Sequence, residues 1–370
     1  MTTPPTQHTL LSGDLLPTIA QFQRGACEDM RPFYALRRPL SNLFDDSGLV
    51  HDAAMVSISV KLTPWIHTYG PARLRLLVAC LPHMHDVVVL FAVYFGHLDL
   101  LPHLPLAMES NLPLLDIAAA RGHVAMVQYL HSTYDKGVGC STLAMDTAAA
   151  HGYLAIVRFL HFHRSEGCTH AAMDQAASHG YADVLAFLDA HRNEGASPMA
   201  MGLAATHGHL NALAYLHDAA VRRGDSRRWG TYVMDYAAIE GHLDVVQFLH
   251  LHRPADGCSV NALNGAATRG NLEMVRWLHM HRTEGCTTSA MDGAARFGHL
   301  HVLAFLHAHR NEGCTAEALK SAARHDHVDV VTWLLEKKRP VHDHVLDALR
   351  QSKHPQIMFK LRQALALTTR

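Results

Sequence analysis

A glycine, usually followed by histidine, returns through most of the chain at a nearly constant interval, and this repeat constrains the fold more than any other feature. The repeated positions are Gly96, Gly122, Gly152, Gly180, Gly208, Gly241, Gly270, Gly298 and, in the same slot, Asp326. The intervals are 26, 30, 28, 28, 33, 29, 28 and 28 residues. A chain with such a period buries its apolar surface by stacking each unit on the next. We therefore expect a repeat architecture instead of one large core.

Each unit predicts two helices separated by the glycine, as in the unit Cys286–Gly313. The threonine after the cysteine is a favourable N-cap for the first helix, and Gly298 ends that helix because glycine adopts a left-handed C-cap without strain. Apolar residues then recur at helical spacing in the second helix. Its predicted buried face is Val302, Leu303, Phe305 and Leu306. The sequence His-Arg-x-Glu-Gly closes the second helix with basic residues and a C-cap glycine.

The run Ala-Met-Asp-Gly-Ala-Ala-Arg-Phe-Gly-His-Leu, residues 290–300, resembles the ankyrin signature Thr-Pro-Leu-His-x-Ala-Ala-x-x-Gly-His, and nine copies span about residues 83–340. Thr-Pro is absent, and the usual period is 28 residues instead of about 33. Aspartate stands where the ankyrin family has histidine, at Asp146, Asp174, Asp235 and Asp292. Since both helices survive, the missing residues fall on the β-hairpin that joins ankyrin repeats. The resemblance implies an all-α fold, an α-solenoid of stacked helix-turn-helix ankyrin-like repeats with mostly truncated β-hairpins and helical caps.

The chain divides into three predicted parts. Residues 1–82 do not repeat, and they predict a helical N-terminal cap in which about the first 12 residues are disordered. Residues 83–340 hold the nine repeats, and residues 341–370 form a capping repeat, because a solenoid needs atypical ends to cover its last apolar face. The unit 208–241 carries the insertion 221–230, which either restores a hairpin or forms a loose loop.

Charge and composition narrow the classes of partner. A net charge of −1 over 370 residues gives no attraction to nucleic acids or acidic membranes, so we expect neither as a partner. The longest apolar run, 87–95, is half of a membrane span, and we expect no secretory signal. Five of the seven cysteines recur as Gly-Cys-Ser/Thr, on helices that lie too far apart for disulfides. We therefore expect free thiols, a cytoplasmic or nuclear location and a monomer.

The chain has 32 histidines, but their spacing argues against a metal site. The histidines that look most like ligands form His-x-His pairs on the second helix. Two ligands on one helix face need a spacing of three or four residues. Equivalent histidines of adjacent units lie about 8 to 10 Å apart, too far to share one zinc ion. We therefore predict no metal and no cofactor. The pairs are His161/His163, His250/His252, His279/His281 and His307/His309.

Two more repeated series are predicted to be structural. Aromatic residues at one position of the second helix predict a core ladder: Tyr129, Phe159, Phe187, Tyr215, Phe248, Trp277, Phe305 and Trp333. The histidine after each glycine is expected to hydrogen-bond the backbone in the turn. Neither a nucleophile with its base nor a phosphate-binding loop stands out from the repeat, so we predict that the chain is not an enzyme.

Binding residues should vary while the frame around them stays constant. The residue just before the glycine varies in this way, and the ankyrin resemblance places the first helix on a concave face. These candidates are Arg121, His151, His179, His207, Glu240, Arg269, Phe297 and His325, with Gln175 and Tyr236 one turn earlier. The insertion offers a second group, because arginines beside a tryptophan supply ion pairs and an anchor: Arg222, Arg223, Arg227, Arg228 and Trp229. Solvated surface variation is the alternative for both groups.

The sequence thus predicts a non-catalytic scaffold or adaptor that binds a protein partner on the concave face. An alternative is a substrate receptor of a ubiquitin ligase, whose adaptor is recruited by an F-box-like segment within residues 10–60; the run 15–22 resembles the start of an F-box. A metal-dependent enzyme that uses the histidines is a third alternative. If many histidines are partly buried, their pKa values should lie below the usual value of about 6.5, and stability should fall in mild acid.

Overall fold

The computed structural model describes residues 27–36, 44, 50–104, 112–134, 139–225, 227–338 and 342–368. These ranges are helical and contain no strand, apart from one β-bridge between Phe44 and Val50. The prediction of an all-α fold is confirmed. Within the same ranges no helix is both long and apolar enough to cross a membrane. Contacts between residues divide the chain into two compact units, Met1–Ala172 and Met173–Arg370.

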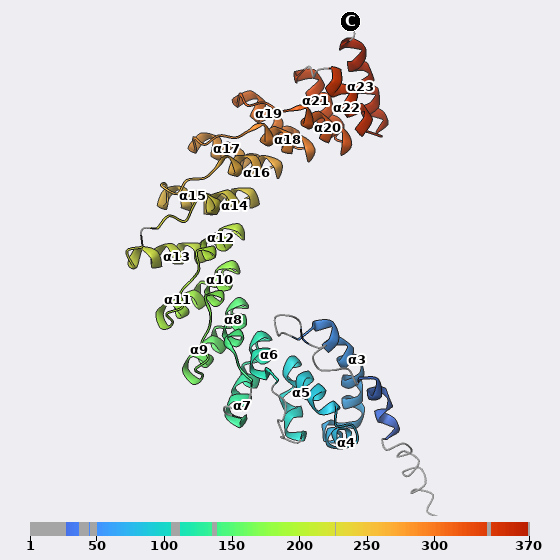
Figure 1. Cartoon of the computed structure of the whole chain (residues 1–370), viewed down its shortest axis with the longest axis vertical. Coiled ribbons are helices and arrows are strands. Elements are labelled where there is room, and N and C mark those ends of the chain that lie inside the picture. Colours follow the sequence, from blue (N-terminus) through green and yellow to red (C-terminus); the bar gives the residue numbers. More distant parts are fainter. Residues whose placement is uncertain are drawn as a thin grey trace, which may run out of the picture. The chain divides into compact units, whose positions relative to one another are not determined.

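The first unit begins with helices that do not belong to the repeat and continues with helix pairs (Figure 1). Its elements are η1 (Glu28–Leu36), α3 (Asp52–Tyr69), η3 (Pro71–Arg73), α4 (Leu74–Cys80), α5 (Met84–Phe95), η4 (Leu98–His103), α6 (Leu114–Ala120), α7 (Val124–Tyr134), α8 (Thr142–Ala150), α9 (Leu154–His163) and the start of α10 (His170–Ser178). After α5 the expected second helix is only the short 3-10 helix η4. Pro102 lies inside it, and proline cannot donate the backbone hydrogen bond that an α-helix needs there.

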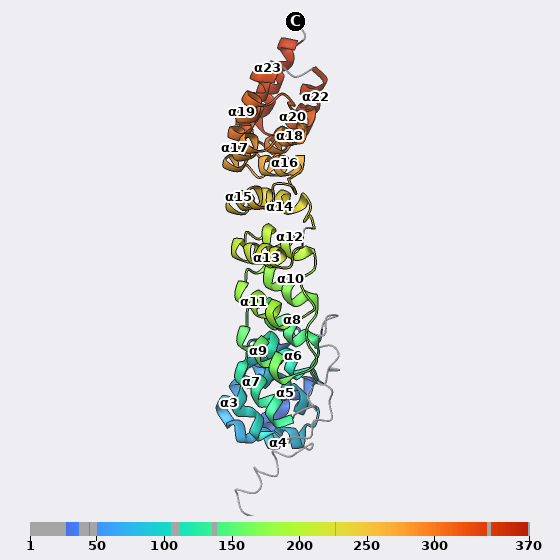
Figure 2. The ribbon, with the colours of Figure 1, turned by 90° about the vertical axis from the view of Figure 1, so that its left-hand side faces the viewer.

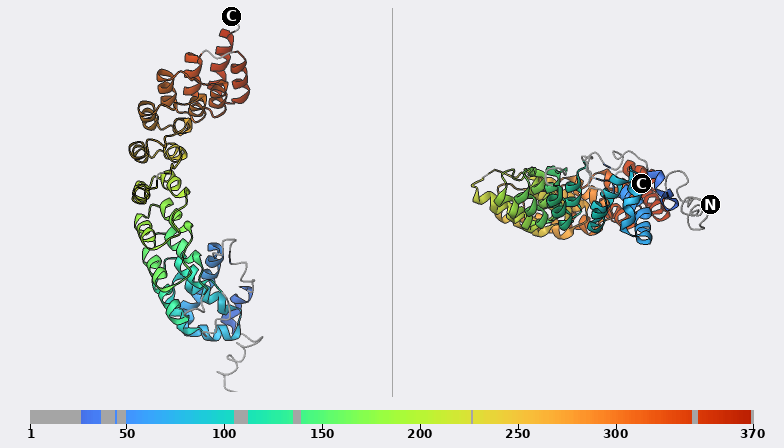
Figure 3. Two further views of the ribbon diagram at one scale, coloured as in Figure 1. Left: turned by 60° about the vertical axis from the view of Figure 1, so that its left-hand side comes forward. Right: turned by 90° about the horizontal axis from the view of Figure 1, so that it is seen from below.

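The second unit consists of the end of α10 and thirteen further helices among its described residues. They are α11 (Ala182–His191), α12 (Met199–Thr206), α13 (Leu210–Arg222), α14 (Tyr232–Glu240), α15 (Leu243–His252), α16 (Val260–Thr268), α17 (Leu272–His281), α18 (Thr288–Arg296), α19 (Leu300–His309), α20 (Ala316–Arg324), α21 (Val328–Lys338), α22 (His342–Gln351) and α23 (Pro355–Thr368). First helices pack on first helices, and second helices on second helices: Figure 2 shows α14, α16 and α18 in one column and α15, α17 and α19 in the next. At the C-terminal end α22 and α23 pack on α20 and α21 (Figure 3).

Small residues bring the first helices close together. Ala294 and Ala295 of α18 are fully buried. A Cβ added to Gly265 of α16 would lie 2.2 Å from Ile239 of α14, and one added to Gly293 would lie 2.1 Å from Thr268. In the second helix of the same unit Val302, Leu303 and Leu306 are fully buried, as predicted. Phe305 is only half-buried, so the predicted buried face is wrong at this position.

The turn between the two helices has the predicted geometry. Gly298 and its equivalents have φ near +75°, and Asp326 adopts φ +61° in the same slot, where a short polar side chain is tolerated. The histidine after the glycine lies over the glycine of the preceding repeat, so that a Cβ on Gly208 would lie 2.4 Å from the His242 ring. His242 Nε2 lies 3.0 Å from the carbonyl oxygen of Thr206. The prediction that these histidines hydrogen-bond the backbone is confirmed, and the bonds join adjacent repeats.

The insertion at residues 221–230 forms a loop and no hairpin among its described residues. α13 runs to Arg222 and is 13 residues long, against 10 for α15, α17 and α19. Gly224 then ends the helix with φ +66°. The F-box-like run 15–22 and the first 12 residues, predicted to be disordered, lie outside the described residues.

Candidate protein-interaction surface

The residue before each turn glycine is exposed in every repeat for which the sequence predicts a binding role. We call these residues the turn row: Arg121 and His151 in the first unit, and His179, His207, Glu240, Arg269, Phe297 and His325 in the second. Each lies at the C-terminal end of a first helix, directly before the left-handed turn. The two candidates one turn earlier, Gln175 and Tyr236, are exposed as well. The helix ends therefore present different side chains from one constant backbone position.

Three histidines of the turn row also cap their own helices. The Nδ1 atoms of His151, His179 and His207 lie 2.8, 2.9 and 2.9 Å from the carbonyl oxygens four residues earlier. A carbonyl can only accept, so Nδ1 carries the hydrogen in each case. Each of these carbonyl oxygens also accepts the backbone N–H of the same histidine, so the ring adds a second hydrogen bond at the end of the helix. In its neutral form each ring therefore keeps Nε2 as an acceptor on an exposed side chain.

The turn row of the second unit and its neighbour Tyr236 combine charged and aromatic groups. Arg269 donates to Glu240 across 2.8 Å, and both side chains are largely exposed. Phe297 is 51% exposed and lies 5.4 Å from the guanidinium of Arg296. Tyr236, one turn before Glu240, is 49% exposed. This mixture of an ion pair and aromatic groups is typical of surfaces that bind proteins.

The insertion supplies less free surface than its sequence suggests. Trp229 is buried, at 8% exposure, and its ring lies 5.8 Å from that of His217, so Trp229 is not available as a surface anchor. Arg222 and Arg223 both pair with Asp189 of α11. Arg227 binds the carboxylate of Asp225 and lowers its pKa to about 2. Arg228 is exposed.

The repeated aspartate, which sequence reasoning treats only as a departure from the ankyrin signature, holds the next repeat. Asp235 of α14 accepts the backbone N–H of Ser259 at 2.7 Å and its hydroxyl at 2.6 Å. Ser259 in turn caps α16 through the N–H of Asn261. The same pair of bonds joins Asp116 to Ser141, Asp146 to Thr169 and Asp292 to Thr315. Asn264 accepts the backbone N–H of Thr287 in the same way, and its side-chain amide donates to the Thr287 hydroxyl. The signal in the sequence is an Asp or Asn that precedes the capping Ser or Thr by 23 to 25 residues.

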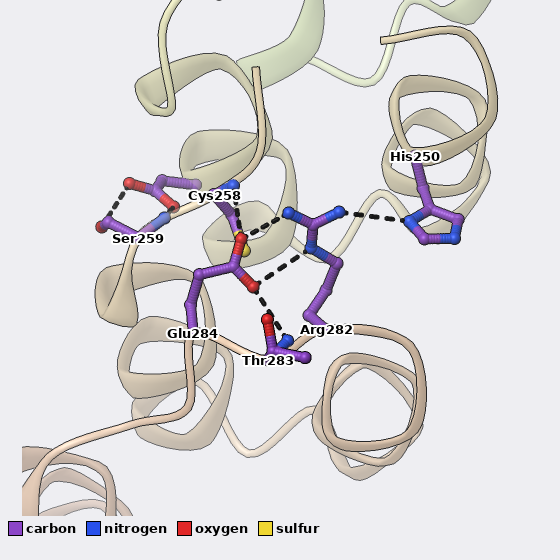
Figure 4. Close-up of polar contacts among 7 residues, drawn as sticks. His250, Cys258, Ser259, Arg282, Thr283 and Glu284 are labelled. Atoms are coloured by element: carbon purple, nitrogen blue, oxygen red, sulfur yellow. Dashed lines mark hydrogen bonds and ion pairs between the residues drawn. The ribbon is translucent and has the colours of Figure 1, made fainter. Parts of the chain in front are cut away.

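A second polar contact, which we call the Arg–Glu clamp, covers the cysteine at the start of its own repeat (Figure 4). Arg282 and Glu284 form a two-bond ion pair, and Glu284 accepts the backbone N–H of Cys258 at 3.3 Å. Burial opposes the charge on Glu284, but the hydrogen bonds from Arg282 and the backbone outweigh it and lower its pKa to about 2. Burial, assisted by the negative charge of Glu284, raises the pKa of Cys258 to about 12. The thiol therefore stays protonated and unreactive.

Family comparisons agree with this geometry. A family described as ankyrin repeats (many copies) matches residues 234–279, and one described as ankyrin repeats (3 copies) matches residues 263–344. Residues 234–344 carry ankyrin repeats. The family predicted from the Gly-His units is thereby confirmed. No curated protein matches the chain.

In these ankyrin repeats the His-x-His pairs and the aromatic series form one ladder, which sequence reasoning missed. The first histidine packs edge-on against the aromatic residue of the next repeat, and the second stacks on the aromatic residue of its own repeat. His250 lies 5.3 Å from Trp277, and His281 lies 4.6 Å from Trp277. Most of the aromatic residues are half-buried, so the predicted core ladder lies at the edge of the core.

His250, the first histidine of one of these pairs, must be neutral in this arrangement. Nη1 of Arg282 lies 3.3 Å from Nδ1 of His250, and since arginine can only donate, Nδ1 must accept (Figure 4). Burial lowers the pKa of His250, and the positive charge of Arg282 lowers it further. Burial lowers the pKa of His217 and His279 in the same way. Within the described ranges no three His, Cys, Asp or Glu side chains come together as a metal site.

Proposed function

We propose that the chain is a non-catalytic scaffold that binds a protein partner through the turn row and its neighbours Gln175 and Tyr236. Ankyrin repeats are in general protein–protein interaction modules. The observation that carries the proposal is the division within each repeat: recurring polar residues are used in contacts between repeats, whereas the turn row is exposed and changes from repeat to repeat. In this proposal residues 83–340 form the binding part, and residues 1–82 and 341–370 cap it.

The test is affinity capture with quantitative mass spectrometry. The turn-row variant carries His151→Ala, His179→Ala, Glu240→Ala and Arg269→Ala. A matched control carries four exposed substitutions on second helices, Gln128→Ala, Gln247→Ala, Glu273→Ala and Arg276→Ala. We expect the turn-row variant to lose partners that the wild type and the control retain, with circular dichroism showing all three folded. Partners retained by the turn-row variant would contradict the proposal.

A further inference from the structure

A cavity of about 320 Å³ opens in the first unit beside two residues of the turn row. It is lined by Tyr94 of α5, by Arg121 and His123 at the turn after α6, and by His151 and Tyr153 at the turn after α8. A smaller hollow of about 160 Å³ shares some of these residues and continues to Asp52 of α3. The larger volume is at the low end for ligand sites. It has room for a side chain of a partner, whereas a large cofactor needs more.

The lining of the larger cavity carries positive charge and no acid. The guanidinium carbon of Arg121 lies 4.2 Å from the ring centroid of Tyr94, a distance at which the ring face attracts a cation. Burial and the hydrogen bond to Asp52 raise the pKa of Tyr94 to about 12, so Tyr94 stays a neutral phenol. The side chain of Arg121 is 41% exposed and is therefore accessible from the cavity.

A carboxylate of the chain already lies beside this arginine. Asp52 accepts the hydroxyl of Tyr94, and its carboxylate is 3.6 Å from Nη1 of Arg121. That distance is longer than a hydrogen bond, and the Asp52 side chain is 75% exposed. Since a guanidinium has five N–H donors, Arg121 keeps donors for a second carboxylate.

The aromatic walls are fixed by the same turns that join the repeats. Tyr153 stands where most repeats have histidine, and a Cβ on Gly122 would lie 2.6 Å from its ring. His151 stacks on Tyr153 at 5.7 Å and 12°, and its Nδ1 bonds the backbone of Thr147. His123 Nε2 lies 3.0 Å from the carbonyl oxygen of Tyr94. These rings need no rearrangement to receive a ligand, which lowers the cost of binding.

We propose that this cavity binds an aspartate or glutamate side chain of the protein partner, with the carboxylate on Arg121 and the aliphatic part of the side chain against the aromatic walls. Charge-assisted hydrogen bonds from arginine to carboxylate are among the strongest in proteins. The inference rests on the proposed function and adds to it the chemistry of one partner residue.

The experiment is an NMR titration of the histidine and tyrosine side chains of the full chain. The probe is the pentapeptide Gly-Gly-Glu-Gly-Gly with blocked ends, compared with its Gln counterpart and with acetate. We expect the Glu peptide to shift the ring signals of His151 and Tyr153 in the millimolar range, and to bind about tenfold tighter than either comparison probe. Arg121→Gln should abolish the shifts, and Asp52→Asn should strengthen binding by releasing Arg121 from its own carboxylate.

The matched control is Arg276→Gln, which removes an exposed arginine of α17 in the second unit, outside the turn row. It should leave the titration unchanged, and thermal unfolding checks that both arginine variants are folded. Equal binding of the Gln peptide, insensitivity to Arg121→Gln, or absence of shifts would overturn the inference. Acetate that binds as tightly as the Glu peptide would make the cavity a site for small acids and would also overturn it. If partners are captured as proposed above and the Glu peptide still fails to bind, only this inference is wrong.

Discussion

Two neighbouring junctions of the second unit join their repeats with different chemistry. Between α14 and α16, Asp235 accepts both donors of Ser259. Between α12 and α14 both partners of this contact are replaced by glycine: Gly202 stands in the aspartate slot and Gly230 in the serine slot. The ring of Tyr232 instead lies 2.8 Å from where a Cβ of Gly202 would be, and its hydroxyl donates to the carbonyl oxygen of Pro198.

The same two junctions also differ near the second helices, in the residue that fills the cysteine slot. Trp229 occupies the slot that Cys258 and Cys286 fill in later repeats. Arg253 stacks on Trp229 at 4.6 Å, just as Arg282 covers Cys258 in the Arg–Glu clamp. Arg253 keeps an ion pair, with Asp256 at 2.8 Å, so ring contacts replace the thiol and the aspartate–serine bonds while the helices keep their packing. The helix packing is the same at both junctions, although the residues that make the contact differ. Where one partner of the contact is replaced, the residue facing it is replaced as well.

The largest expected effect follows from removing the ring that replaces the cysteine. Trp229→Ala should lower the free energy of unfolding by about 3 kcal/mol, because it leaves a cavity beside His217. Cys258→Ala in the equivalent slot should cost about 1 kcal/mol, since a smaller group is lost. Urea unfolding followed by circular dichroism measures both. Equal costs for the two substitutions would contradict this prediction, because the ring would then stabilise the repeat no more than the thiol does.

The polar junction is tested by its aspartate. Asp235→Ala should cost about 2 kcal/mol, because it leaves the part-buried N–H of Ser259 without its acceptor. Asp235→Asn should retain most of the stability, because Asn264 bonds both the backbone N–H and the hydroxyl of Thr287 at 3.0 Å, its amide donating to the hydroxyl. Thermal unfolding compares the three proteins. An Asn variant as unstable as the Ala variant would mean that the charge is needed and the geometry is not enough.

The histidine ladder should make the repeats sensitive to mild acid. Burial depresses the pKa of His217, His250 and His279 in the folded state. The unfolded chain then binds more protons as pH falls below about 6.5, so stability is full above that pH and decreases as pH falls through the folded pKa values. We expect the unfolding midpoint to drop by about 2–4 °C for each kcal/mol lost.

The control for this effect replaces all three histidines by asparagine, whose side-chain oxygen can accept the arginine donor without titrating. The triple variant should show a flatter dependence of the unfolding midpoint on pH between neutral and mildly acidic buffer. An unchanged pH dependence would place the effect on other histidines, such as His209 and His299, whose pKa values burial also lowers.

The smallest expected effect concerns the turn row. Glu240→Gln should change stability by no more than about 0.5 kcal/mol, because its ion pair with Arg269 is exposed to solvent. A loss comparable to that of Asp235→Ala would move Glu240 from the binding surface into the structural frame. Thermal unfolding of the two single variants in one buffer gives the comparison.

The sequence predicts local structure well, because helix ends, caps and exposure are set by residues close together in the chain. The helix breaks at Gly298, the caps at Ser259 and Thr287, and the exposure of the turn row all follow from residue types within one unit. The half-buried position of Phe305 was mispredicted, because helical spacing alone does not show that its ring packs against His279 of the preceding repeat and His309 of its own.

Contacts between repeats could not be predicted in the same way. Asp235 and Ser259 lie 24 residues apart on different helices, and their pairing depends on how closely the helices approach. Trp229 was expected on the surface because it lies among arginines, yet the α13 extension returns it to the cysteine slot. The Asp235–Ser259 contact and the burial of Trp229 both depend on three-dimensional packing, which the periodicity of the sequence does not predict.

The central claim is that each repeat separates stability from binding, and one paired measurement tests it. The unfolding midpoint and the set of captured partners are determined together for the turn-row variant and for Asp235→Ala. The account predicts that the turn-row variant keeps the wild-type midpoint and loses its partners, while Asp235→Ala lowers the midpoint and keeps the partners below its unfolding transition. A turn-row variant that is destabilised as much as Asp235→Ala, or that keeps its partners, would contradict the account.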